Sequence, residues 1–142
     1  MIELYSDGGA QPNPGVAAWA FVIVKDGTRV YSASGIVGDH ETNNVAEYHA
    51  MFHGVTWLFE HRGLCEGEEI WLVSDSQLLI NQLNGSYKVN NVKLRHLHSA
   101  IMAVGKLLFG ETGVHLKWNP RENEWTSFCD RLCDGEIERF KL

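Results

Sequence analysis

Several features that mark special classes of protein are rare or missing in this chain of 142 residues. It has only three cysteines, Cys65, Cys129 and Cys133, and an odd number without a C-x-x-C pair argues against a disulfide framework. No apolar run approaches the roughly 20 residues of a membrane-spanning helix. The first residues lack a basic segment followed by a long apolar run, so we predict no secretory signal and expect a cytoplasmic location. Linkers and repeats are also missing, which predicts one domain over residues 1–142.

Basic residues are scarce, with 12 Lys and Arg against 18 Asp and Glu, a net charge of −6. Such a balance is unusual for a nucleic-acid-binding protein, which normally shows a basic footprint. Residues 76–110, however, contain no acidic residue and include Lys88, Lys93, Arg95 and Lys106. A locally basic stretch in an acidic chain fits a protein that docks a polyanion on one face. A chance cluster on a solvated helix is the alternative interpretation.

Hydrophobic periodicity predicts an α/β domain with a mixed five-stranded sheet flanked by helices. Strands are predicted over residues 2–7, 16–24, 28–37, 69–74 and 114–118. Helices are predicted over residues 42–62, 76–84, 91–109 and 126–138, with Gly63 as a C-cap and Thr126 as an N-cap. The first three strands form an antiparallel meander, because Asp26-Gly27 is a strong hairpin signal. The last two follow helices and are predicted to be parallel.

Four carboxylates, each in a different segment, are candidate metal ligands: Asp7, Glu47, Asp75 and Asp130. Asp7 and Asp75 follow apolar runs, Glu47 opens a helical pattern, and Asp130 lies one turn into the last predicted helix, near its positive end. Strand ends and helix N-termini gather at one edge of an α/β sheet, so these side chains are expected to meet.

Converging carboxylates repel one another unless cations lie between them, and hard oxygen ligands select Mg²⁺ or Mn²⁺. Two such ions could clamp the attacking water and the leaving oxygen of a phosphodiester. The pattern therefore predicts hydrolysis of phosphates without a nucleophile from the protein.

Six short motifs follow one another along the chain. They are residues 5–10 (Tyr-Ser-Asp-Gly-Gly-Ala), 13–15 (Asn-Pro-Gly), 42–48 (Thr-Asn-Asn-Val-Ala-Glu-Tyr), 74–77 (Ser-Asp-Ser-Gln), 81–85 (Asn-Gln-Leu-Asn-Gly) and 129–132 (Cys-Asp-Arg-Leu). On these motifs the chain resembles a type 1 ribonuclease H (RNase HI) from residue 2 to about residue 133.

The resemblance implies a ribonuclease H-like fold and one catalytic domain over residues 1–142. The implied reaction is endonucleolytic cleavage of the RNA strand of an RNA–DNA hybrid, giving 5′-phosphate and 3′-hydroxyl ends. Two Mg²⁺ ions are implied as cofactors, with Mn²⁺ as an alternative. Asp7, Glu47, Asp75 and Asp130 match the four metal-binding carboxylates of the family.

The resemblance also implies contacts with the hybrid. A-form-like duplexes display 2′-hydroxyls in a wide minor groove that short amide side chains can reach. Asn13, Asn43, Asn44 and Gln77 match the positions that contact this groove. Thr42 matches a residue that holds a DNA phosphate, and Gly8 and Gly9 would let the backbone come close. Alternatively, Thr42 or Asn43 simply caps a helix and Asn13-Pro14-Gly15 is simply a turn.

The chain departs from the family pattern in three places. Residues 84–91 replace an extra basic helix and loop, which resembles the branch without that protrusion and predicts weaker, more salt-sensitive binding unless Tyr87 and Lys88 compensate. No histidine lies in residues 116–142. Residues 118–123 occupy the place of the family's loop histidine, and either Arg121 or Glu122 could replace it. Arg121 could meet the scissile phosphate, although it cannot act as a base near neutral pH, and Glu122 could shuttle protons. Asp134, one turn after Asp130, is a rival fourth ligand.

Other functions stay open. The chain could be a catalytically silent nucleic-acid-binding module of the same fold, or a related nuclease that acts on DNA or branched junctions. An aspartyl-phosphate enzyme built on Asp75 would leave Glu47 and Asp130 without a role.

Two further groups of residues are interpreted as structural. His49 and His53 have the spacing of zinc ligands but are expected at the surface, since no third ligand is evident. Cys129 and Cys133 are expected in the core. Buried positions are also expected for four tryptophans, Trp19, Trp57, Trp71 and Trp118.

Overall fold

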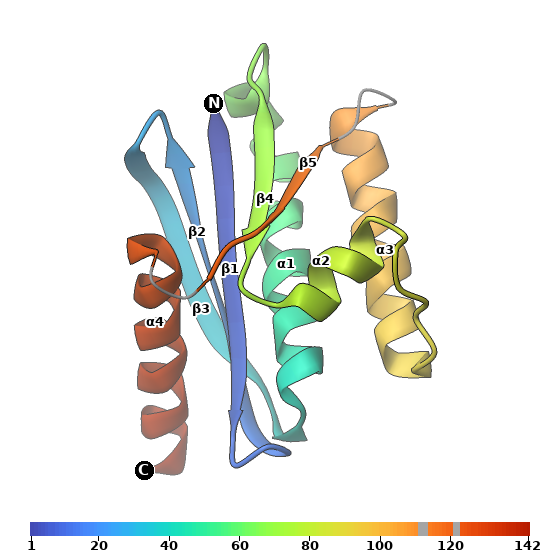
Figure 1. Cartoon of the computed structure of the whole chain (residues 1–142). Helices are drawn as coiled ribbons and strands as arrows, with labels where there is room; N and C mark the ends of the chain where they lie inside the picture. The colour runs from blue at the N-terminus through green and yellow to red at the C-terminus, as the bar shows by residue number, and fades with distance from the viewer. Residues whose placement is uncertain (111–113, 121–122) are drawn as a thin grey trace.

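The computed structural model describes residues 1–110, 114–120 and 123–142. Its centre is a five-stranded sheet in the order β3-β2-β1-β4-β5 (Figure 1). The strands are β1 (Ile2–Gln11), β2 (Gly15–Lys25), β3 (Thr28–Glu41), β4 (Ile70–Ser74) and β5 (His115–Trp118). The first three pair antiparallel, while β4 pairs parallel with both β1 and β5. The predicted mixed sheet is confirmed.

Strand β1 is longer than predicted. Its parallel pairing with β4 ends at Ser6 and Ser74, but its antiparallel pairing with β2 continues to Gln11. The sequence suggested an end at Asp7 because Gly8-Gly9 offers no apolar alternation, and backbone pairing with β2 overrides that weak local signal. Asp7 therefore lies inside a strand, at the level where the parallel partner stops.

The helices are α1 (Asn43–Glu60), α2 (Gln77–Leu83), α3 (Val92–Phe109) and α4 (Glu124–Lys141), with a short 3₁₀ helix, η1 (Arg62–Cys65), after α1. Thr42 is the N-cap of α1, where its side chain accepts a hydrogen bond from the Val45 N–H at 3.2 Å. Helix α1 ends at a His61 C-cap, so the predicted Gly63 cap is wrong: the chain tightens into η1 before glycine is needed.

Helix α4 begins two residues earlier than predicted. Its N-cap is Asn123, whose side chain accepts from the N–H groups of Trp125 and Thr126. Thr126 is therefore not the cap but a fully buried residue of the first turn. Asp130 consequently lies nearly two turns inside α4, where the helix dipole acts on it less than we expected.

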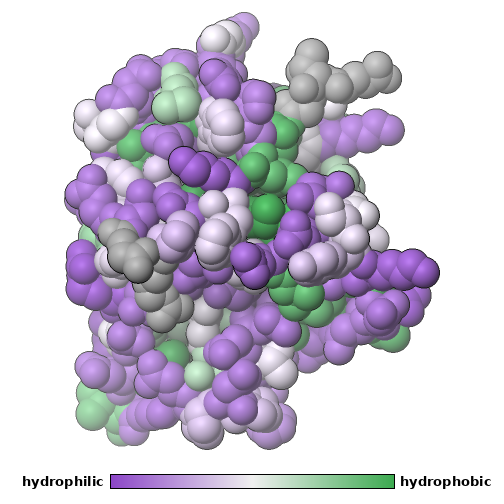
Figure 2. Space-filling model, in the orientation of Figure 1, coloured by the Kyte–Doolittle hydropathy of each residue, from purple (hydrophilic) through white to green (hydrophobic). Residues whose placement is uncertain are grey.

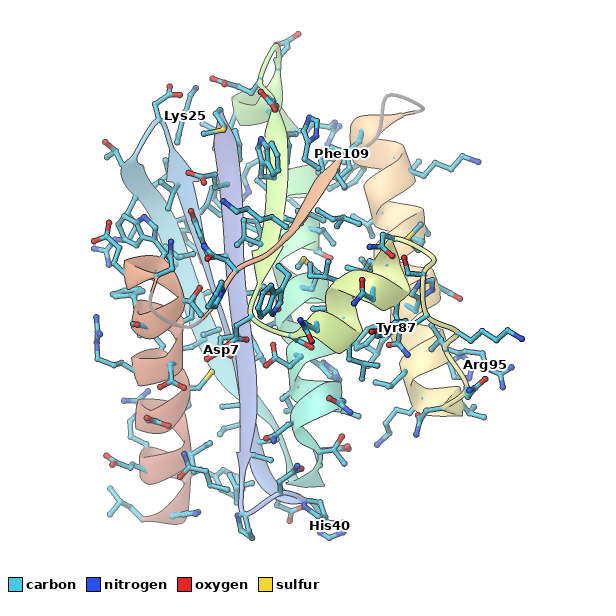
Figure 3. The ribbon with its side chains drawn as sticks, viewed as in Figure 1. Asp7, Lys25, His40, Tyr87, Arg95 and Phe109 are labelled. Carbon is cyan, nitrogen blue, oxygen red and sulfur yellow. The ribbon has the colours of Figure 1, made fainter. Side chains whose placement is uncertain are left out.

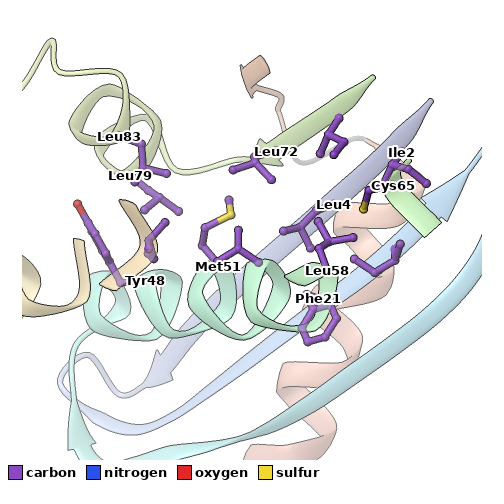
Figure 4. Packing of buried hydrophobic residues seen from close by; sticks show 14 of the residues in the cluster. Ile2, Leu4, Phe21, Tyr48, Met51, Leu58, Cys65, Leu72, Leu79 and Leu83 are labelled. Atoms are coloured by element: carbon purple, nitrogen blue, oxygen red, sulfur yellow. The ribbon is translucent and has the colours of Figure 1, made fainter. Parts of the chain in front are cut away.

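The helices form two layers around the sheet. Helix α4 packs on one face of β1–β3, and α1 packs on the other and is itself covered by α3 (Figure 1). The larger core lies on the α1 side, where Leu4, Met51 and Leu58 meet between helix and strand (Figure 4). The smaller core lies under α4 and contains Cys129 and Cys133, which confirms their interpretation as core residues.

Hydrophilic side chains cover most of the face shown in Figure 2. Apolar side chains gather in a hollow beside α3, a groove of about 700 Å³ whose lining includes Ile101, Met102, Phe109 and Leu116. Among the described residues, no helix combines the length and apolar character needed to cross a membrane.

Candidate acidic metal site

Three of the four predicted carboxylates meet in one cluster. Asp7 of β1, Glu47 of α1 and Asp75, just after β4, each place a carboxylate oxygen within 4.8 Å of the others. Asp7 and Glu47 are buried, at 1% and 7% relative exposure, and Asp75 is partly exposed. Figure 3 labels Asp7 midway along β1, near the lower end of β4. The cluster is therefore anchored in the core and opens to solvent on the side of Asp75.

The parallel register of β1 and β4 explains why Asp7 and Asp75 meet. Ser6 pairs with Ser74, so the next residue of each strand leaves the paired region at the same level. The carboxyl ends of parallel strands are where α/β sheets place ligands. The sequence prediction of this meeting is confirmed, although only β4 ends there.

Glu47 reaches the cluster because α1 lies unusually close to β1. A Cβ atom on Gly8 would lie 2.3 Å from the carbonyl carbon of Ala46 and 2.5 Å from the amide nitrogen of Glu47. Any larger residue at Gly8 would push the helix away. At Gly9 the nearest atom to such a Cβ is the Asn43 side-chain oxygen at 4.0 Å, so Gly9 has open space. A role for either glycine in substrate approach stays a prediction.

The backbone bend that contains Asp75 is held by hydrogen bonds from the end of β5 and by one bond within the bend itself. The Trp118 indole N–H donates to the backbone carbonyl of Asp75 at 2.9 Å, and the Asn119 N–H donates to the carbonyl of Ser74 at 3.0 Å. The Ser74 hydroxyl accepts from the Ser76 N–H at 3.0 Å. Trp118 is 43% exposed, so its predicted core position is wrong: it lies at the end of a short edge strand.

Asp130 lies on α4, outside the group of three. Its part of α4 crosses β1 at the level of Asp7: the neighbouring Cys129 thiol donates to the Tyr5 carbonyl at 3.7 Å, and the Cys133 thiol, one turn on, donates to the Asp7 carbonyl at 3.5 Å. Burial and then the nearby carboxylates, Asp7 first, raise the pKa of the Cys129 thiol. The rival, Asp134, accepts a hydrogen bond from the Gln11 side chain at 2.9 Å. Gln11 is four residues beyond Asp7, roughly 13 Å along an extended strand. The geometry therefore favours Asp130 over Asp134 as the nearer carboxylate.

The predicted minor-groove residues form a small hydrogen-bonded corner at the start of α1. The Asn13 side-chain oxygen accepts from the Asn43 N–H at 3.0 Å, and the Asn43 side-chain oxygen accepts from the Ala10 N–H at 2.7 Å. These bonds tie the β1–β2 turn to the helix. Both asparagines are exposed, as are Asn44, Thr42 and Gln77, so a structural role and contact with a ligand are compatible.

The connector between α2 and α3 is held by Gln82, which belongs to the motif at residues 81–85 but had no predicted role of its own. Gln82 is buried, accepts a hydrogen bond from the Tyr48 hydroxyl and donates to the Lys88 carbonyl at 3.0 Å. It thereby joins α1, one residue from Glu47, to the loop that exposes Tyr87 and Lys88. Burial raises the pKa of Tyr48 to about 12. A polar residue within the apolar run of α2 was the available signal.

Arg121 and Glu122 lie outside the described residues. Among the described residues, the acidic trio is the one group with metal-ligand spacing, and His49 and His53 do not add a second. The surface position predicted for these histidines is wrong, because both are half-buried and the His53 ring stacks on Trp19 at 3.8 Å. Burial lowers the pKa of each.

A mixed sheet in this order, with carboxylates meeting where its parallel pair ends, defines a protein of the ribonuclease H-like fold. The profile of the family described as "Reverse transcriptase-like" matches residues 5–126. The chain belongs to this family, and its similarity to curated ribonucleases H and to ribonuclease H1 structures places it among the type 1 ribonucleases H.

Curated relatives include a bifunctional protein of Mycobacterium tuberculosis, 26% identical over 96% of this chain and 35% of the relative. The Ribonuclease H of Caldanaerobacter subterraneus is 28% identical over 98% of this chain and 92% of the relative. This chain thus spans only 35% of the length of the first curated relatives that it matches.

Two solved structures agree closely with this fold. LC11-RNase H1 in complex with an RNA/DNA hybrid has a TM-score of 0.89 at 28% identity, with 100% of both chains covered. The N-terminal RNase H domain of the Mycobacterium tuberculosis protein has a TM-score of 0.84 at 26% identity, covering 97% of this chain and 94% of that one.

Proposed function

We propose that this chain is an endoribonuclease that hydrolyses the RNA strand of RNA–DNA hybrids, leaving 5′-phosphate and 3′-hydroxyl ends. The observation that carries the proposal is the meeting of Asp7, Glu47 and Asp75 within 4.8 Å on three separate elements. It is supported by the similarity, over the full chain, to a ribonuclease H1 bound to a hybrid. All four carboxylates of the family pattern are present, which argues against a catalytically silent module.

The site suits hard divalent cations, so the proposed cofactors are two Mg²⁺ ions, with Mn²⁺ as a substitute. Its donors are carboxylate oxygens, and two of the three carboxylates are buried where mutual repulsion is poorly screened. Asp7, Glu47 and Asp75 would hold the ions, and Asp130 would complete the set from α4. When bound, such ions would supply the positive charge that activates water and stabilises the leaving oxygen.

The protein's own residues would then orient the substrate. Asn13, Asn43, Asn44 and Gln77 are exposed near the starts of α1 and α2 and would contact the 2′-hydroxyls of the minor groove. Thr42 would hold a phosphate of the DNA strand. Their exposed side chains lie at helix starts or, for Asn13, on a turn that is hydrogen-bonded to the start of α1, so they can position a duplex over the acidic cluster without ordering a loop.

The basic stretch, residues 76–110, is proposed to contact the part of the duplex that lies beyond the acidic cluster. Residues 84–91 join α2 to α3 directly and expose Tyr87 and Lys88. Phosphate contacts from such residues are electrostatic and weaken as salt rises. Arg121 and Glu122 are proposed to act at the scissile phosphate and in proton transfer, respectively. The expected cytoplasmic location and the assignment to the branch without a protrusion also stay predictions.

A substrate panel tests this function. Purified protein is incubated with Mg²⁺, Mn²⁺ or EDTA and with labelled RNA–DNA hybrid, single-stranded RNA, duplex RNA, duplex DNA and a branched DNA junction, and both binding and cleavage are measured. We expect metal-dependent cleavage of RNA in the hybrid alone. Binding of the hybrid without cleavage would instead establish the silent module, and cleavage of duplex or branched DNA would establish the related nuclease.

A further inference from the structure

The three clustered carboxylates differ in how their backbones are held. Asp7 lies within β1 and Glu47 within α1, where ladder and helix hydrogen bonds fix the chain on both sides. Asp75 lies in the bend between β4 and α2 and belongs to neither. Its position therefore depends more on individual contacts than the positions of Asp7 and Glu47 do.

One of those contacts comes from a side chain with no place in the motif set. The indole N–H of Trp118 donates to the Asp75 carbonyl at 2.9 Å, and the next residue, Asn119, donates its backbone N–H to Ser74 at 3.0 Å. Together these bonds extend the β4–β5 pairing, which ends at Ser74 and Trp118, by one residue past the strand. The bend that carries Asp75 is thus fastened to β5.

The exposure of Trp118 shows that packing alone does not account for its position. Its side chain is 43% exposed, on the outermost strand of the sheet, so only part of the ring contributes to a core. A large, half-exposed ring whose polar atom is bonded to the backbone of a cluster residue fits a positioning role. Outer groups of this kind tune metal sites by orienting the ligands.

We propose that Trp118 is a positioning residue that holds Asp75 in the acidic cluster and thereby sets the affinity of the site for divalent metal. The proposal rests on the proposed function, because it assumes that the cluster binds metal. It assigns Trp118 no contact with the reacting atoms.

A matched pair of variants separates this role from a general loss of packing. Trp118→Phe keeps a ring and removes the N–H donor. Trp71→Phe removes an equivalent bond at the other end of β4, where the Trp71 indole donates to the Glu69 side chain at 3.0 Å, away from the acidic cluster. Melting curves in EDTA show whether the two variants fold as well as each other. Trp118→Leu, which also lacks the donor, repeats the test if Trp118→Phe does not fold.

Binding of Mn²⁺ to the protein without nucleic acid, measured by calorimetry, is the primary readout. We expect the dissociation constant of Trp118→Phe to rise roughly three- to ten-fold, the effect of one hydrogen bond, and that of Trp71→Phe to stay unchanged. In cleavage assays Trp118→Phe should regain the wild-type kcat at saturating Mn²⁺, with an unchanged KM for the hybrid. Because the melting curves in EDTA show separately whether the variant folds, recovery of kcat with added Mn²⁺ would report on the metal site and not on folding.

Two results would overturn the proposal in distinguishable ways. If the wild type and Trp118→Phe bind Mn²⁺ equally, Trp118 does not position Asp75, while the proposed metal site stands. If the wild type binds no Mn²⁺, or if Asp75→Asn binds it as tightly, the metal site of the proposed function fails and the inference fails with it.

Discussion

Gly8 and Ala46 bring β1 and α1 into backbone contact: a Cβ atom on Gly8 would lie 2.3 Å from the carbonyl carbon of Ala46. The contact lies one residue from both Asp7 and Glu47. The absence of a side chain at Gly8 therefore determines how closely these two carboxylates can approach each other.

Gly8→Ala should damage both stability and the site. The methyl group collides with helix backbone, which cannot rotate away as a side chain can, so we expect a loss of about 3 kcal/mol in unfolding free energy. Gly9→Ala is the matched control, because its methyl group would meet only the Asn43 side-chain oxygen at 4.0 Å. Urea denaturation measures the difference, and equal stability of the two variants would contradict the close approach.

Substitutions of Asp130 and Asp134 should have clearly different effects on cleavage. Asp130→Asn removes the proposed fourth ligand, so cleavage at low Mg²⁺ should fall by about 10²-fold or more. Asp134→Asn keeps an oxygen that can accept the Gln11 hydrogen bond. Its cleavage rate should therefore match that of the wild type, and its unfolding free energy should stay within about 0.5 kcal/mol of the wild-type value. Steady-state cleavage rates check both, and the reverse order of defects would make Asp134 the ligand.

Asn43 and Gln77 should differ in how their loss affects the protein. Asn43→Ala removes the acceptor of the Ala10 N–H, so it should lower the unfolding free energy by about 1 kcal/mol and also raise KM for the hybrid. Gln77→Ala, at an exposed helix start, should raise KM with little change in stability. Paired denaturation and kinetic measurements test this. An unchanged KM in both variants would leave Asn43 with a structural role alone.

His53 predicts a pH dependence of stability. Burial lowers its pKa below the ordinary 6.5, so on acidification the unfolded chain takes up a proton before the folded protein does. Stability is therefore complete above about pH 6.5 and is lost as pH falls through that value toward the lower pKa of the folded state. In His53→Phe, which keeps a ring against Trp19, the melting temperature should fall less between about pH 7.5 and 5.5. Identical slopes would contradict the prediction.

The sequence predicted the architecture well where periodicity is strong. The apolar run before Asp75 and the helical pattern around Glu47 identified β4 and α1, and the hairpin signal at Asp26-Gly27 identified the β2–β3 turn. Element ends were less certain. The Gly8-Gly9 pair concealed the continuation of β1. Thr126 was mistaken for a helix N-cap because threonine occurs both at N-caps and at buried positions inside helices.

The contacts that shape the site could not be read from the sequence. That Gly8 faces Ala46, or that the Trp118 indole reaches Asp75, depends on how elements distant along the chain cross in space. Trp118 reads as one more apolar residue of a strand, and only its place at the sheet edge exposes it. Sequence patterns supplied the carboxylates, and tertiary packing supplied their geometry.

The most direct test of the central claim is Mg²⁺-dependent cleavage of a hybrid labelled on its RNA strand, by wild type and by Asp7→Asn in parallel. We predict short RNA fragments with 3′-hydroxyl ends from the wild type, none in EDTA, and none from Asp7→Asn although that variant melts at the wild-type temperature or above. Neutralising one buried carboxylate relieves repulsion in the metal-free cluster, which explains the expected stability. Full activity of a folded Asp7→Asn protein, or equal wild-type cleavage in EDTA, would contradict the account.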